Sequence, residues 1–163
     1  MSVGATSAGL ILYRRTPQGD GTTPGGDLEV LLGHMGGPFW ARKDAGAWTI
    51  PKGEYAEGED PHAAAVREFT EELGMAPPAG PDLALGVVRQ RAGKTVTVWA
   101  RAGDLDVSRA VSNLFELEWP PRSGRLQSFP ELDRVRWVPV AEAPGRLISA
   151  QVELIDRLVA ALR

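Results

Sequence analysis

The chain has 163 residues, none of them cysteine; 43% are hydrophobic and 24% charged, and the formal net charge is −3. This length and composition predict one soluble domain over 1–163, and the acidic balance argues against a surface built to hold nucleic acid. Disulfide frameworks, cysteine-ligated zinc and thiol catalysis are excluded, and since there is neither a signal segment nor an apolar stretch of the roughly 20 residues that span a membrane, we expect a cytoplasmic protein.

The N-terminal third predicts a β-hairpin followed by an aromatic loop. Residues 6–13 and 28–32 are short apolar runs of the kind that form buried strands, and the Pro/Gly/Thr-rich segment 16–26 favours a long loop between them. Residues 33–46 are rich in glycine and aromatic residues. A short strand is expected at 48–50, directly before a proline.

A helix is predicted from Pro61 to about Leu73. Asp60 is a suitable N-cap residue, and proline is favoured at the first helical position. Gly74 is the expected stop residue, because glycine adopts the left-handed backbone conformation at a helix end without penalty.

The second half of the chain predicts further strands and a last helix. Strands are expected over 83–90, 95–101 and 135–140, whereas 103–130 is expected to be irregular. Apolar residues at helical spacing over 147–162 predict an amphipathic C-terminal helix. Helices packed on a sheet make an α/β protein the economical interpretation.

Three glutamates lie on one face of the predicted central helix. Glu68, Glu71 and Glu72 are spaced i, i+3 and i+4, which brings their carboxylates together. Like charges at this spacing destabilise a helix by roughly a few tenths of a kcal/mol per pair. A Mg²⁺ or Mn²⁺ ion, which prefers oxygen ligands, would remove that penalty. The alternative is a solvated acidic surface, and the three acids by themselves favour it.

The sequence around these acids favours the metal site instead. Residues 53–75 resemble the Nudix signature G-x5-E-x7-R-E-U-x-E-E-x-G-U, where U is a bulky apolar residue. Every fixed position is matched, and the residues are Gly53, Glu59, Arg67, Glu68, Glu71, Glu72 and Gly74, with Phe69 and Met75 at the bulky positions. At ordinary residue frequencies, such a match arises by chance about 10⁻⁸ times per starting point.

The resemblance implies a fold and a reaction. The fold is a Nudix-type α/β/α sandwich with a mixed central sheet, the loop and helix of the motif, and a C-terminal helix. The reaction is Mg²⁺-dependent hydrolysis of a phosphoric anhydride bond, with Mn²⁺ as a substitute. The implied metal ligands are Glu68, Glu71, Glu72 and the Gly53 carbonyl.

The resemblance also implies catalytic roles. Glu68 is the first candidate for activating water, with Glu72 beside it, and Arg67 would orient these carboxylates by ion pairing. Glu131 is the second candidate, because some family members place an extra carboxylate just before the last strand. Glu116 and Glu118 compete with Glu131 for this role, and an ordinary loop glutamate is the alternative.

Candidate substrate-binding residues lie outside the motif. Lys52 completes a Pro-Lys-Gly segment similar to that of relatives acting on dinucleoside or diphosphoinositol polyphosphates. Phe39 and Trp40 are candidates to stack a base, and Arg42, Lys43 and Arg89 are candidates to hold phosphates. Core packing and plain solvent exposure are the alternatives.

The sequence thus predicts a pyrophosphohydrolase for a nucleoside polyphosphate, with diadenosine tetraphosphate-like substrates slightly preferred. The alternatives are (d)NTPs including oxidised nucleotides, a diphosphoinositol polyphosphate, or a nucleotide-binding module without catalysis. A tyrosine typical of diadenosine polyphosphate hydrolases is missing from the window that holds Arg91, Ala92 and Gly93. We expect a small-molecule nucleotide or polyphosphate as partner, no nucleic acid, no membrane, and a monomer or homodimer.

Overall fold

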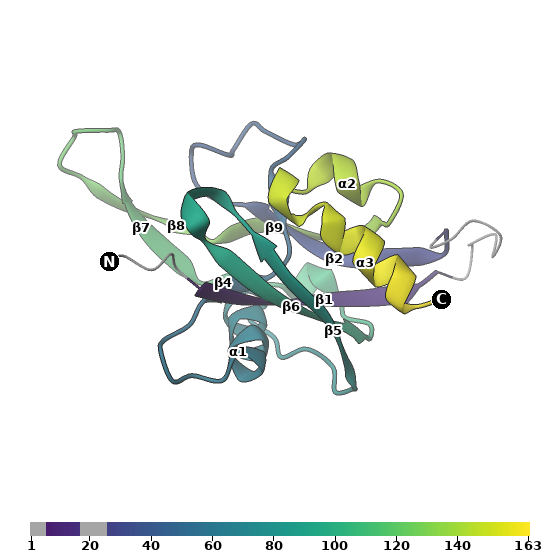
Figure 1. Ribbon diagram of the computed structural model, residues 1–163. Coiled ribbons are helices and arrows are strands. Elements are labelled where there is room, and N and C mark those ends of the chain that lie inside the picture. Colours follow the sequence, from purple (N-terminus) through teal and green to yellow (C-terminus); the bar gives the residue numbers. More distant parts are fainter. Residues whose placement is uncertain (1–5, 17–25) are drawn as a thin grey trace.

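The computed structural model describes residues 6–16 and 26–163, so the predicted loop at 16–26 lies almost wholly outside the described residues. Figure 1 shows a twisted sheet with one helix on one face and two helices on the other, which is the α/β/α arrangement expected from the sequence. Of the helices in the described ranges, none has the length and apolar character needed to cross a membrane.

Strands from both halves of the chain form a single mixed sheet. Within the described residues they are β1 (Thr6–Arg15), β2 (Leu28–Met35), β3 (Trp48–Thr49), β4 (Lys52–Glu54), β5 (Asp82–Arg89), β6 (Thr95–Ala102) and β9 (Leu132–Pro139). β1 runs parallel to β6, and it pairs antiparallel with β4 near its start and with β2 near its end. β5 extends the sheet beyond β6, and β9 and β3 extend it beyond β2. The sequence predicted all of these strands except β4.

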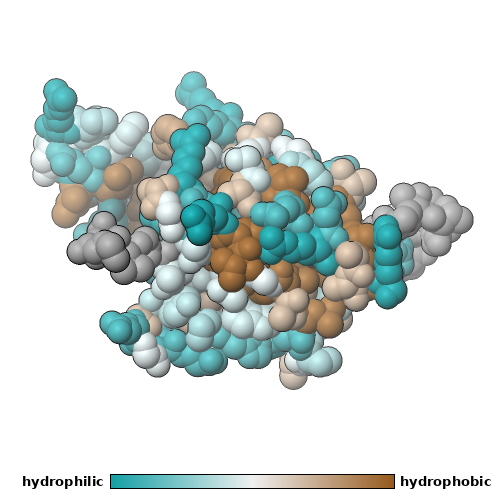
Figure 2. Space-filling model, viewed as in Figure 1, coloured by the Kyte–Doolittle hydropathy of each residue, from teal (hydrophilic) through white to brown (hydrophobic). Residues whose placement is uncertain are grey.

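The alternation of side chains along β1 shows why both faces of the sheet are buried. Ala8, Leu10 and Leu12 point to one face and pack in the core cluster that contains Phe69 of α1 (Pro61–Leu73). Ile11 points to the other face, in the cluster that lies under the C-terminal helix α3 (Glu153–Ala161). Figure 2 shows the hydrophilic outer side of α3 with apolar residues at its margins.

Helix α1 begins and ends as the sequence predicts. The Asp60 carboxylate accepts a hydrogen bond from the backbone N–H of Ala63 at 2.9 Å, which caps the helix. Gly74 ends it with φ 68°, and a Cβ there would lie 2.6 Å from the carbonyl oxygen of Val111. Both ends of the helix are therefore fixed, and its acidic face is held in place.

The prediction that residues 103–130 are irregular is wrong. A short 3-10 helix η2 (Val107–Arg109) is followed by β7 (Leu114–Glu118) and β8 (Leu126–Pro130), which pair as a hairpin projecting from the body in Figure 1. The aromatic rings of Phe115 and Phe129 pack on each other across this hairpin at 6.0 Å. Apolar and acidic residues alternate over 115–118 in β7, which is the pattern of a strand. The two prolines at 120 and 121, shortly after it, favoured an irregular segment instead.

The prediction of one continuous helix over 147–162 is also wrong. The structure has α2 (Ala143–Arg146), a 3-10 turn η3 (Ser149–Gln151) and then α3, with another such turn, η1 (Arg91–Gly93), between β5 and β6. Leu147 forms a bridge to Trp48 instead of continuing α2, and the buried Gln151 side chain accepts a hydrogen bond from the backbone of Ile50 at 2.9 Å. These contacts with the sheet override the helical periodicity.

The core under α1 predicts that alanine substitutions at two phenylalanines differ greatly in their effect on stability. Phe69 is fully buried, whereas Phe39 is 63% exposed. Phe69→Ala should reduce the free energy of unfolding by about 3–5 kcal/mol, because it leaves a cavity between α1 and the sheet. Phe39→Ala is the matched control and should change it by less than about 1 kcal/mol. Denaturant unfolding measures both, and equal losses would contradict the assigned core.

Candidate active site

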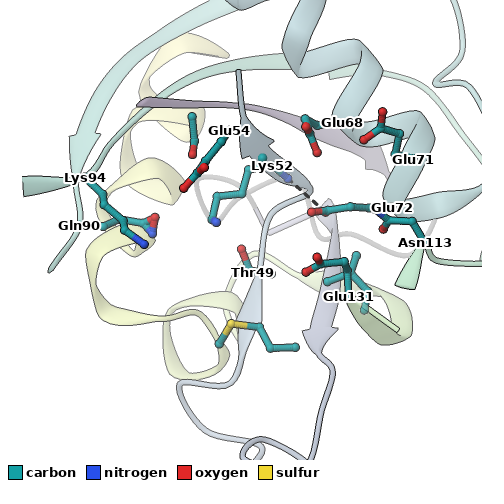
Figure 3. Close-up of a pocket in the computed structure, with 14 residues that line it drawn as sticks. Thr49, Lys52, Glu54, Glu68, Glu71, Glu72, Gln90, Lys94, Asn113 and Glu131 are labelled. Atoms are coloured by element: carbon teal, nitrogen blue, oxygen red, sulfur yellow. Dashed lines mark hydrogen bonds between the residues drawn. The ribbon is translucent and has the colours of Figure 1, made fainter. Parts of the chain in front are cut away.

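Carboxylates from three parts of the chain face one cavity of about 520 Å³. The charged residues that line it are Glu54, Glu68, Glu71, Glu72, Glu131, Lys52 and Lys94. Figure 3 shows the α1 glutamates and Glu131 on one side and Gln90 with Lys94 on the opposite side. The side formed by α1 is therefore acidic, and the positive charges come from β4 and from the turn between β5 and β6.

The pairing of β4 with β1 brings Gly53 against Glu68. Gly53 lies opposite Ala8 in this ladder, and a Cβ at position 53 would stand 2.0 Å from Oε2 of Glu68. No side chain fits there unless the carboxylate moves. The glycine of the motif is thus explained by the close approach of β4 to a helix carboxylate.

Arg67 binds three carboxylates at once. Its Nε donates to Glu59 at 2.8 Å, and its Nη1 donates to Glu68 at 2.9 Å and to Glu71 at 3.1 Å. These partners raise the pKa of Arg67, and the guanidinium lowers the pKa of Glu59 below its ordinary value. Arg67 makes the contacts that the predicted orienting role needs, and the role itself stays a prediction.

Three carboxylates of the cavity are harder to ionise than ordinary glutamates. Burial raises the pKa of Glu72 to about 8, with repulsion from Glu68 and Glu131 adding to the effect, although the Lys52 ammonium and the Lys52 backbone N–H oppose it. Burial is also the main cause of the raised pKa of Glu68, where Glu71 adds repulsion, and of Glu131. Ionising the acids together is costly, so a cation in the cavity would be bound favourably.

The donor atoms suit a hard divalent cation. In the described ranges, no three Asp, Glu or His side chains converge as a preformed metal site. Arg67 holds Glu68 and Glu71, and the backbone of Lys52 holds Glu72. Carboxylates crowded into one cavity next to the Gly53 backbone are nevertheless the oxygen ligands that Mg²⁺ and Mn²⁺ prefer.

The extra carboxylate of the cavity is Glu131. It lies between β8 and β9 and lines the cavity, whereas Glu116 and Glu118 are exposed on β7 and do not. The backbone N–H of Glu131 donates to the carbonyl of Asn113 at 2.9 Å, at the base of the β7–β8 hairpin. Asn113 lines the cavity too, and sequence reasoning missed it because the hairpin was not predicted.

The structure places the predicted substrate-binding residues in different parts of the molecule. Lys52 lines the acidic cavity, and Trp40 and Lys43 line a second one of about 580 Å³. Arg42 and Arg89 are exposed and line neither of these cavities. Glu54 was missed, although its position directly after Gly53 was a signal, since β4 carries it to the cavity.

A family model and two curated relatives match most of this chain. The family model described as NUDIX domain matches residues 6–158. The chain is 27% identical over 148 residues to an RNA pyrophosphohydrolase from Aeromonas hydrophila, which covers 86% of this chain and 83% of that protein. It is 29% identical over 128 residues to an RNA pyrophosphohydrolase from Rhizobium meliloti, which covers 70% of this chain and 71% of that protein.

Solved structures confirm the fold. The NUDIX domain of Shewanella oneidensis NrtR, complexed with ADP ribose, matches with a TM-score of 0.65 at 17% identity, over 100% of this chain and 91% of that one. A C. elegans Ap4A hydrolase binary complex matches with a TM-score of 0.59 at 23% identity, over 97% of both chains. The mixed-sheet sandwich expected from the sequence is thereby confirmed.

The raised pKa of Glu72 predicts how stability depends on pH in metal-free protein. The folded state keeps a proton on Glu72 up to about pH 8, whereas the unfolded chain releases it near the ordinary value of 4.5. Stability should therefore fall as pH rises between these two values, and a divalent cation should restore it at pH 8. Thermal unfolding measures this, and Glu72→Gln should flatten the dependence. The same slope in both proteins would refute the assignment.

Proposed function

The chain belongs to the NUDIX domain family, and from that membership we propose how its acidic cavity works and on which substrates. The protein is a hydrolase of phosphoric anhydride bonds, in a family that uses divalent metal ions. Mg²⁺, or Mn²⁺ in its place, would be held by Glu68, Glu71, Glu72 and the Gly53 carbonyl. When bound, such an ion stabilises the negative charge that develops on phosphate oxygens. The observation that carries this proposal is the gathering of these carboxylates in one cavity.

Glu68 is the proposed general base. Its Oε1 is held by Arg67 at 2.9 Å, while its Oε2 lies on the Gly53 side. Burial, with repulsion from Glu71, raises the pKa of Glu68 above the ordinary glutamate value in the metal-free protein, which strengthens it as a proton acceptor. Water attacks one phosphorus, its proton passes to Glu68, and the phosphorus–oxygen bond of the anhydride breaks. The departing phosphate keeps the bonding electrons, and because water itself attacks the phosphorus, no covalent enzyme intermediate is needed.

Lys52 and Lys94 are the proposed phosphate-binding cations of this cavity. Both line it, and Lys94 lies across the cavity from the α1 glutamates. A polyphosphate that spans the cavity meets metal-binding acids on one side and an ammonium group on the other. This arrangement supports a substrate with several phosphates in a row.

Two substrate classes are supported by different observations. A dinucleoside polyphosphate is favoured by Lys52 in the cavity and by the segment Pro-Lys-Gly. A 5′-polyphosphate end of RNA is the second candidate, because two curated relatives are named RNA pyrophosphohydrolase. That candidate departs from the expectation of no nucleic acid, which rested on net charge. We place the dinucleoside polyphosphate first and test both.

A substrate panel with one isosteric variant tests the reaction. Dinucleoside tetraphosphate, dNTPs and 5′-triphosphorylated RNA are assayed with Mg²⁺ or Mn²⁺ and their products identified. Glu68→Gln should lower kcat by about 10²–10⁴, because it removes the proton acceptor. Glu57→Gln is the control, since Glu57 is exposed in the loop between β4 and α1 and does not line the cavity. No turnover of any anhydride substrate would contradict the proposal, and a larger loss in Glu131→Gln would move the base to Glu131.

Arg67 is a positioning residue, which predicts a particular kinetic signature. A lysine ammonium is a compact point charge and lacks the planar fork from which Nε and Nη1 of Arg67 reach three carboxylates. Arg67→Lys should therefore lower kcat by about tenfold or more and weaken the apparent affinity for Mg²⁺, with part of the loss recovered at high Mg²⁺. Arg157→Lys is the control, because Arg157 pairs with Glu153 on the surface of α3. A loss that does not respond to Mg²⁺ would mean that Arg67 acts on stability alone.

A further inference from the structure

The cavity of about 580 Å³ that adjoins the acidic one has the opposite character. The two share Met35, Gln90 and Lys94. Its lining includes three cations, Lys43, Arg91 and Lys94, and no acid among the described residues. A ligand that extends from one cavity to the other would leave the acidic glutamates and meet positive charge and aromatic surface.

An exposed aromatic ring forms part of this second cavity. Phe39 is 63% exposed, although burying such a ring is favourable. It stands edge-on to Trp40, with ring centroids 4.9 Å apart, and Trp40 packs against the main core. The Lys43 ammonium lies 3.6 Å from the centre of the Phe39 ring. The ammonium therefore covers one face of the ring, and the exposed remainder is a surface on which a planar, negatively charged ligand can stack.

A buried histidine fixes the loop that carries these side chains. His34 is fully buried, with Nε2 2.5 Å from the Lys43 carbonyl oxygen and Nδ1 2.7 Å from Asp133. The N–H of Lys43 donates to the Trp40 carbonyl at 2.9 Å. The aromatic surface is therefore held in position before any ligand arrives, which lowers the entropy cost of binding.

Two further cations of this cavity come from a strained turn. In η1, Ala92 has φ 61°, a left-handed conformation that costs about 1 kcal/mol in a residue with a Cβ. Bonds from Gln90 N–H to the Lys94 carbonyl and from Lys94 N–H to the Arg91 carbonyl close the turn. Arg91 and Lys94 thereby line the same cavity from one tight turn.

We propose that this second cavity binds a nucleoside 5′-phosphate unit of the substrate. The base stacks on Phe39 beside Lys43, and the adjoining phosphates lie near Arg91 and Lys94. The anhydride bond to be cleaved then extends into the acidic cavity, so the assignment rests on the proposed function. The same unit occurs in a dinucleoside polyphosphate and at the 5′ end of an RNA.

Binding without metal isolates the second cavity from the first. The acidic cavity repels a phosphate when no cation neutralises its glutamates. AMP titrated in EDTA, and followed by NMR or calorimetry, therefore reports on the basic cavity. Phe39→Ala and Lys43→Ala should each weaken AMP by about fivefold or more, the size expected for one lost stacking or cation contact. Ribose 5-phosphate, which lacks the base, should not respond to Phe39→Ala.

Two control variants match these changes. Arg42→Ala removes the same charge one position earlier, from a side chain that does not line the cavity. Leu114→Ala removes a hydrophobic side chain that is as exposed as Phe39, at 63%. Both should leave the affinity for AMP within about twofold of the original. An equal loss in Arg42→Ala and Lys43→Ala would mean a general electrostatic effect and overturn the site.

The outcomes separate this inference from the proposed function. AMP affinity unchanged in Phe39→Ala and Lys43→Ala overturns the site, even if hydrolysis proceeds normally. AMP binding that depends on Phe39 supports the site, even if no polyphosphate is cleaved. In turnover, Phe39→Ala should raise KM more than it lowers kcat. The substrate class that shows this rise in KM, dinucleoside tetraphosphate or triphosphorylated RNA, identifies the source of the bound unit.

Discussion

Crowding of carboxylates in a half-buried cavity is the constraint on which the rest of the molecule depends. Glu68 and Glu72 sit on the face of α1 that also buries Phe69, so they cannot turn fully into solvent. Like charges brought this close oppose folding unless they are protonated, paired or bound to a cation. Arg67 supplies pairing on one side of the helix, and the Lys52 backbone supplies a hydrogen bond on the other. What remains is a favourable place for a divalent ion.

The sheet brings to this cavity the groups that α1 lacks. β4 places Gly53 and Lys52 beside the helix by pairing with β1. The pairing of β9 with β2 fixes the position of Leu132, the neighbour of Glu131. The β5–β6 turn adds Lys94, which belongs to both cavities. The proposed function divides chemistry from recognition: acids on the helix side would serve the reacting phosphate, and cations with aromatic rings on the loop side would bind the rest of the substrate.

Sequence reasoning recovered the parts that depend on local signals. The cap at Asp60 and the stop at Gly74 gave both ends of α1, and the motif spacing gave its acidic face. Contacts between distant segments were not predictable in this way. Leu147 leaves the helical pattern because it pairs with Trp48. Asn113 reaches the cavity at the base of the β7–β8 hairpin, and the prolines of that segment did not indicate that these two strands pair. Arg42 and Lys43 are adjacent in sequence, but the conformation of their loop places only the second of the two side chains in the lining of the second cavity.

Metal binding by the carboxylates of α1 is the central claim, and a titration with Mn²⁺ alone tests it most directly. Electron paramagnetic resonance measures the concentration of free Mn²⁺ as the ion is added to the protein without substrate. Glu71→Gln and Glu72→Gln should each weaken binding by about tenfold or more, since each removes a proposed ligand charge. Glu57→Gln, outside the cavity, should bind as the unchanged protein does. Equal Mn²⁺ affinity in all four proteins would contradict the account.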